Sequence, residues 1–249
     1  MTGSLLVLLP PSEAKNPGGS LLPKIGSFDE ELAEPRREII AALGRLFANG
    51  SHTNLEKTLK VRGPLLGRAT DATRDLLEGR ARLLPGWRRY SGVVWAHLEP
   101  ERLSAAQRRR ILVPSGLYGM TTAEDKVADY RLKMNSSLAP MGNVAAFWKP
   151  YLTPVLLERF SGARIVNLLP KEHEAAFDLR EINRVVDLVT IHFVSHNGQG
   201  AAGHAAKAVK GLVASEILNG RLDQLESFRW QGWRARRSEG QLLLVAPRP

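Results

Sequence analysis

The fold is decided near the start of the sequence by the stretch Leu5-Leu6-Val7-Leu8-Leu9-Pro10-Pro11-Ser12-Glu13-Ala14-Lys15. Its first five residues form a short, continuous apolar run, which is typical of a buried strand. The run lacks a basic lead-in, is too short for a signal peptide, and stops at the two prolines. The loop that follows, Pro10–Gly26, is rich in Pro, Gly and Ser, and its length indicates a functional or mobile segment around Ser12 and Lys15.

Outward from this stretch, apolar patterning predicts both helices and strands. Helices are expected at Glu34–Ala48, at Thr53–Leu83 as two helices broken around Gly63-Pro64, at Val144–Glu158 and at Ala205–Asn219. Strands are expected at Gly92–Trp95, Ile111–Pro114, Ala128–Lys133, Ile165–Leu169 and Asp187–Val194, with Phe228–Arg234 and Gln241–Val245 as a terminal hairpin. Because these elements are interspersed without regular βαβ spacing, we predict a mixed α/β (α+β) fold with a mixed β-sheet, in one domain over residues 1–249.

The composition excludes several classes of protein. The chain has 249 residues, of which 43% are hydrophobic, enough for a sizeable core and too many for a disordered chain. It has no cysteine, which excludes disulfides, thiolate zinc sites and cysteine nucleophiles. No apolar run approaches the roughly 20 residues of a membrane helix, and no export signal is recognised. We therefore expect a cytoplasmic protein with no membrane partner, and the oligomeric state stays open.

Positive charge is the strongest signal in the composition. The chain carries 35 Lys and Arg against 25 Asp and Glu, a net charge of +10 at pH 7. Such an excess favours a partner that carries phosphates, although it also suits a protein that is merely soluble. The clusters Arg108–Arg110 and Arg234–Arg237 are more typical of a solvated surface than of specific recognition.

A glycine-rich turn near the end of the chain has the spacing GxGxxG, at Gly198-Gln199-Gly200-Ala201-Ala202-Gly203. A dinucleotide site needs an acid at the end of a second strand, whereas Glu216 falls within a helical pattern, so we expect no such cofactor. Amides at Gly198 and Gly200, at the start of a helix, would instead bind an anion with Lys207 and Lys210. A plain flexible turn beside a solvated basic face explains the same residues.

A second group of cations lies in the middle of the chain. If Ala128–Lys133 is a strand, Asp129, Arg131 and Lys133 share one face, where Arg131 and Lys133 could hold a phosphate. Asp129 could instead serve a structural ion pair. We predict that Arg131 and Lys133 lack two carboxylate partners and line the same cleft as Lys15.

Three side chains are candidates for catalysis if the protein is an enzyme. His173 follows Glu172 and could form an acid–base pair with it, although a surface pair in a loop explains both residues as well. The other two are His196, beside the glycine-rich turn, and Tyr118, in the turn after Ile111–Pro114. The six histidines are scattered and no GxSxG, HExxH or P-loop motif is present, so we predict no metal site and no cofactor.

Several short fragments together resemble one known family. In order they are Leu8–Lys15, Arg89–Val93, Ser115–Gly119, Asp129–Leu132, Trp148-Lys149, Asn167–Leu169, Val194–His196 and Lys207–Gly211. Their order and spacing across nearly the whole chain resemble the YaaA peroxide-stress family, also called DUF328 or UPF0246. The resemblance implies a compact fold in which helices wrap a mixed sheet and leave a basic cleft. It also implies binding of duplex or branched DNA through a helix-hairpin-helix-like element, a role in limiting iron-driven oxidative damage, and no established catalytic reaction.

Two departures from the family pattern fall where a cleft would be lined. The glycine-rich stretch Gly198–Ala206 is extra, and His173 stands where similar proteins carry an aromatic hydroxyl. These changes favour an enzyme, for instance a biosynthetic one, that acts on a small anionic or nucleotide-like substrate.

The leading hypothesis is nevertheless a DNA-binding protein of this family. Its anion-binding residues would be Ser12, Lys15, Arg131, Lys133, Gly198, Gly200, Lys207 and Lys210. A narrow pocket of converging cations would favour the enzyme, and a groove wide enough for a duplex would favour DNA.

Overall fold

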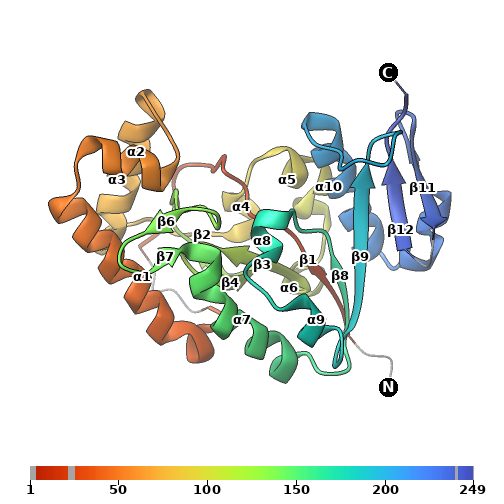
Figure 1. The fold of residues 1–249 in the computed structure, drawn as a ribbon, viewed down its shortest axis with the longest axis horizontal. Coiled ribbons are helices and arrows are strands. Elements are labelled where there is room, and N and C mark those ends of the chain that lie inside the picture. The colour runs from red at the N-terminus through yellow and green to blue at the C-terminus, as the bar shows by residue number, and fades with distance from the viewer. Residues whose placement is uncertain (1–3, 22–25, 239–240, 249) are drawn as a thin grey trace.

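The computed structural model describes residues 4–21, 26–238 and 241–248, and its centre is a mixed β-sheet (Figure 1). In this described part of the chain the sheet has eight strands in the order β10-β11-β12-β9-β8-β1-β3-β4. The strands are β1 (Leu5–Leu8), β3 (Ile111–Ser115), β4 (Gly119–Thr122), β8 (Arg164–Asn167), β9 (Asp187–Val194), β10 (Arg229–Trp230), β11 (Trp233–Ser238) and β12 (Gln241–Val245). β1 pairs in parallel with β3 and β8, and β9 pairs in parallel with β8 and β12. The pairs β3–β4, β11–β12 and β10–β11 are antiparallel, so the predicted mixed sheet is confirmed.

The apolar stretch at the start of the sequence forms the interior strand β1. Leu6, Val7, Leu8 and Leu9 are buried, which confirms the strand expected there. The strand ends before Pro10, which has no N–H to donate to a ladder. Because β1 and β8 are parallel, their carboxyl ends lie side by side, and the loops that follow them leave the sheet at the same end of the strands.

Helices cover the sheet on both sides. The α-helices are α1 (Asp29–Asn49), α2 (His52–Leu59), α3 (Pro64–Leu77), α4 (Gly86–Arg89), α5 (Val93–Leu98), α6 (Ala105–Arg109), α7 (Val144–Arg159), α8 (Lys171–Glu174), α9 (Leu179–Ile182) and α10 (His204–Leu218). Two short pairs of strands, β2 (Leu84–Pro85) with β5 (Lys126–Val127) and β6 (Ser137–Leu138) with β7 (Gly142–Asn143), flank the main sheet. Helix α10 packs against α5 and β1, while α1 and α7 pack against each other and against β4 (Figure 1).

Most of the expected helices and strands are present, with shifted ends. Helix α1 begins at Asp29, so that Pro35 lies inside the helix and not in its first turn. Helices α2 and α3 are separated near Gly63 as expected, and α7 continues through Pro150 and Pro154. Residues 22–25 of the expected loop lie outside the described residues.

Three expected strands differ from the structure. Val93 and Val94 begin helix α5, because close packing against α10 outweighs the strand preference of β-branched residues. Residues 128–133 keep the predicted alternation of burial but form no strand, because none of the described residues pairs with them in a β-ladder. The expected strand Phe228–Arg234 is interrupted by a tight turn at Gln231 and Gly232, both at positive φ, so β11 is the partner of β12.

Candidate functional site

A pocket of about 620 Å³ opens at the edge of the sheet where β1 and β8 end. Its lining comes mainly from the segments 10–15, 92–95, 130–135, 170–173 and 201–210. Segments 10–15 and 170–173 follow β1 and β8, and 201–210 leads into α10. Ligands of open α/β sheets bind outside the carboxyl ends of the strands, which is the position of this pocket. We call it the central pocket.

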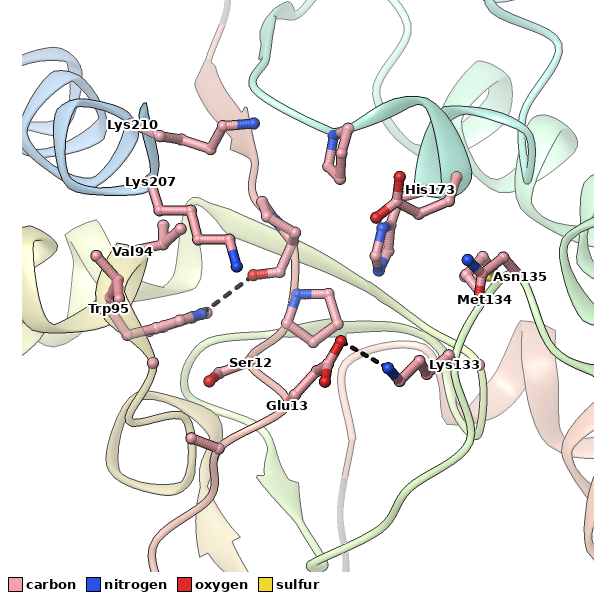
Figure 2. A pocket seen from close by; sticks show the side chains of 18 of the residues that line it. Ser12, Glu13, Val94, Trp95, Lys133, Met134, Asn135, His173, Lys207 and Lys210 are labelled. Atoms are coloured by element: carbon pink, nitrogen blue, oxygen red, sulfur yellow. Dashed lines mark hydrogen bonds and ion pairs between the residues drawn. The ribbon is translucent and has the colours of Figure 1, made fainter. Parts of the chain in front are cut away.

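Positively charged side chains dominate the central pocket. Among the described residues, the cations that line it are Lys15, Arg131, Lys133, Lys207 and Lys210, and the carboxylates are Glu13 and Glu172. Figure 2 shows Lys207 and Lys210 reaching into it from α10, opposite Lys133 and His173. Three segments that are far apart in the sequence thus bring their cations to one small volume.

Lys15 is the most deeply buried of these cations. Its Nζ donates a hydrogen bond of 2.7 Å to the carbonyl oxygen of Ser12 and lies 4.3 Å from the centre of the Tyr130 ring. Burial, together with the charge of Arg131, lowers the pKa of Lys15 to about 7, while Asp129 and Glu13 act in the opposite direction. No carboxylate of the described chain forms an ion pair with Lys15, so its ammonium form is poorly compensated.

Arg131 and Lys133 lie beside Lys15 in the central pocket, but each has a carboxylate partner. Nη1 of Arg131 is 2.9 Å from Asp129, and Nζ of Lys133 is 2.8 Å from Glu13. The prediction that these cations lack partners is therefore wrong. The partner of Arg131, Asp129, is only two residues away in the sequence. The partner of Lys133, Glu13, is distant in the sequence and comes from the loop after β1, which lines the same pocket.

The pairing between Glu13 and Lys133 holds a negative charge at the pocket. Burial disfavours the ionised form of Glu13, but the hydrogen bond and charge of Lys133 hold its pKa below the ordinary value. Lys207 and Lys15 contribute in the same direction. Glu13 therefore stays ionised and offsets part of the positive charge around it.

His173 projects into the central pocket from α8 (Figure 2). Burial lowers its pKa to about 4, and Lys210 lowers it as well, although Glu172 raises it. The imidazole is therefore neutral at pH 7. Its Nδ1 is buried without a hydrogen-bond partner among the described residues, which is uncommon for a buried polar atom.

Two lysines of α10 complete the positive wall. Burial lowers the pKa of Lys210 to about 8, whereas Glu174 and Glu172 raise it. Its Nζ donates to the carbonyl oxygen of Leu168 and lies near the Phe193 ring. Lys207 is exposed and has no ion-pair partner in the part of the chain that the structure describes.

The structure brings some of the predicted residues together and leaves others apart. Ser12, Lys15, Arg131, Lys133, His173, Lys207 and Lys210 all line the central pocket, so the predicted neighbourhood of Lys15 and Arg131 is present. Gly198, Gly200, His196 and Tyr118 do not line it. Tyr118 is buried, and its hydroxyl accepts a hydrogen bond of 3.0 Å from the amide of Ala128.

The glycine-rich turn is closed by its own hydrogen bonds. The amide of Gly198 donates to the carbonyl of Ser195, and the amide of Ala201 donates to the carbonyl of Phe193. The turn connects β9 to α10 and so does not sit between two helices. Glu216 lies inside α10, which confirms the helical pattern expected around it. Anion binding at Gly198 and Gly200 stays a prediction.

Sequence reasoning overlooked two parts of the pocket wall. Glu13 lies between Ser12 and Lys15 in the loop after β1. Its position between two candidate anion-binding residues could have indicated that its carboxylate lies in the same pocket. Trp95 was assigned to a strand; in α5 its Nε1 donates to the carbonyl of Pro10 at 3.1 Å, which fixes the loop after β1.

Within the described residues, no group of three or more His, Asp or Glu is placed to hold a metal ion. None of the helices in residues 4–21, 26–238 and 241–248 is long and apolar enough to cross a membrane.

The sequence is similar to proteins of one family. The family model described as Peroxide stress protein YaaA matches residues 5–239, well over half of the chain. A UPF0246 protein of Streptomyces coelicolor is 30% identical over 221 residues, which cover 86% of this chain and 83% of that protein. A UPF0246 protein of Corynebacterium efficiens is 30% identical over 220 residues, covering 84% and 83%. The chain therefore belongs to the peroxide stress protein YaaA family, which the resemblance of its fragments had indicated.

Proposed function

We propose that this protein binds a small anionic ligand, bearing a phosphate or carboxylate group, in the central pocket. The observation that carries the proposal is the convergence of Lys15, Arg131, Lys133, Lys207 and Lys210 on one pocket of about 620 Å³. Pockets of about 300–1,000 Å³ are typical of small-molecule sites. Positive charge focused in a concave site raises the local concentration of anions.

Several donors in the central pocket remain available to such a ligand. Lys207 is exposed and unpaired among the described residues. The hydrogen bonds of Arg131 to Asp129 and to the Tyr130 carbonyl both use Nη1, so Nε and Nη2 can still form a two-point contact with a phosphate or carboxylate.

DNA binding is the second candidate, and a different surface favours it. Arg234 and Arg236 are exposed on one face of β11, alternating with the buried Trp233 and Ala235. Neither arginine has an ion-pair partner among the described residues, and the whole chain carries a net charge of +10. Side chains of this kind can contact phosphates of a duplex without entering the central pocket.

Two titrations separate these candidates. Calorimetry with inorganic phosphate and adenosine 5′-monophosphate measures small-anion binding, and fluorescence anisotropy with duplex and four-way-junction DNA at two salt concentrations measures DNA binding. Lys207→Ala should weaken phosphate binding about tenfold or more, because it removes a contact with a charged group. Lys57→Ala, on the exposed face of α2, is the matched control and should change nothing.

The outcomes point to different conclusions. If the wild-type protein binds neither phosphate nor the nucleotide, and glyoxylate in the same calorimetry does not bind either, the small-anion proposal is refuted. If Arg234→Ala with Arg236→Ala weakens DNA binding and flattens its salt dependence by about 0.9 per lost contact, while Lys207→Ala does not, DNA lies on β11. The melting temperature of Lys207→Ala should match that of the wild type, since a solvated lysine contributes little to folding.

A further inference from the structure

We infer that Lys15 is a nucleophile that forms an imine with a small aldehyde or ketone carrying an anionic group, such as a 2-oxo acid or a phosphorylated aldehyde. The inference rests on the proposed anion binding in the central pocket and adds to it a reacting group and a substrate class.

The position of Lys15 is unusual for a structural lysine. The residue is 6% exposed and still lines the central pocket. Buried lysines are normally paired with a carboxylate, but Lys15 has no such partner among the described residues. Its Nζ is held by the Ser12 carbonyl between the rings of Tyr130, at 4.3 Å, and Tyr90, at 5.7 Å. The amine is thus fixed in place without being neutralised.

The surroundings of Lys15 favour the neutral amine. Burial lowers its pKa to about 7, and the neighbouring cations Arg131 and Arg89 lower it while Asp129 and Glu13 raise it. Desolvation and a nearby cation are the two known ways to activate a lysine nucleophile. About half of the Lys15 side chains are therefore neutral at pH 7, whereas an ordinary lysine with a pKa near 10.4 is almost entirely protonated.

The chemical step needs no further reagent. The lone pair of Nζ attacks the carbonyl carbon, and the π electrons move to the carbonyl oxygen. The two protons of the neutral amine leave with that oxygen as water, and a C=N bond replaces the C=O bond. Arg131 and Lys207 would hold the anionic group of the substrate, which places its carbonyl near Nζ. A protonated imine withdraws electrons from the adjacent carbon, so the reaction class is bond making or breaking next to a carbonyl.

The test uses pyridoxal 5′-phosphate and glyoxylate as anionic aldehydes, with sodium borohydride to reduce any imine. Peptide mass mapping then identifies the modified lysines in the wild-type protein at pH 7. We expect Lys15 to react at least about tenfold faster than Lys57, because burial favours the neutral, nucleophilic form of the Lys15 amine. Inorganic phosphate should slow this labelling. Lys15→Arg and Lys15→Met should abolish the adduct, and Lys57→Arg should leave it unchanged.

The contrary results are distinct. Phosphate binding together with an unmodified Lys15, or with adducts spread over exposed lysines, refutes the imine and leaves anion binding in place. Equal labelling of Lys15 by glyoxylate and by uncharged propionaldehyde, with no protection by phosphate, refutes the anionic substrate class and the proposed function together. A wild-type labelling rate at Lys15 that rises only near pH 10 also refutes the inference, and this measurement does not depend on the folding of any variant.

Discussion

Replacing Lys15 with Met should stabilise the protein at neutral pH, and by an amount that depends on pH. The substitution keeps an unbranched side chain of similar length in the buried position and removes the ammonium group. In the native protein the pKa of Lys15 is lowered to about 7 by burial. In the unfolded chain it should be near 10.4.

The sign and size of the effect follow from these two pKa values. Between pH 7 and about 10.4 the unfolded chain keeps the proton on Lys15 while the native protein releases it, so the wild-type free energy of unfolding rises with pH. Each pKa unit corresponds to about 1.36 kcal/mol, and Lys15 is already half deprotonated in the native protein at pH 7, so the wild type should gain about 2.3 kcal/mol relative to Lys15→Met between pH 7 and pH 9. Below about pH 6 both states carry the proton, and the difference between the proteins should be constant.

Urea unfolding of both proteins at pH 6, 7, 8 and 9 measures this difference directly. Groups that titrate alike in both proteins cancel in the comparison. If the difference in unfolding free energy stays the same from pH 7 to pH 9, Lys15 titrates normally and the argument from burial fails.

Three further predictions concern the packing of α10 and two residues of the central pocket. Gly211→Ala should destabilise the protein by about 1–3 kcal/mol in urea unfolding, because the new Cβ would overlap the backbone of α5; Gly67→Ala, in open space on α3, should be neutral or slightly stabilising. Wild-type stability should fall as pH drops from about 6.5 towards 4, because the unfolded chain protonates His173 before the native protein does, and His173→Gln should lose that part of the pH dependence in thermal melts. Lys133→Met should raise the pKa of the Glu13 carboxyl, observed by NMR titration, and an unchanged Glu13 pKa would show that the ion pair is absent in solution.

The sequence predicts the strands of the sheet well where they are apolar and central. β1, β3, β8 and β9 were all expected, because each is a largely apolar run with β-branched or leucine-rich content. The expected strand at Gly92–Trp95 is wrong because helix α5 is stabilised by a neighbour that is distant in the sequence. Gly211 permits that contact, since its missing side chain lets α10 approach the backbone of α5.

The sequence indicated the cations that line the central pocket but not the ion pairs and pKa shifts among them. Strand alternation grouped Arg131 with Lys133, and the long loop after β1 drew attention to Lys15. The neutral state of His173 and the lowered pKa of Lys15 depend on burial, which arises only when five segments close around the pocket. The same closure brings Glu13 to Lys133, a pairing that no local pattern reveals.

On the ribosome, β1 emerges long before one of the two strands that pair with it. Its register joins Val7 to Ile111 on one side and Leu8 to Asn167 on the other. At about 5–20 residues per second, roughly 10–30 s separate the synthesis of β1 from that of β8. During this interval the leucine-rich strand has an unpaired edge, which makes the nascent chain prone to aggregation. The segment Leu5–Leu8 is therefore where a chaperone would protect this chain for longest.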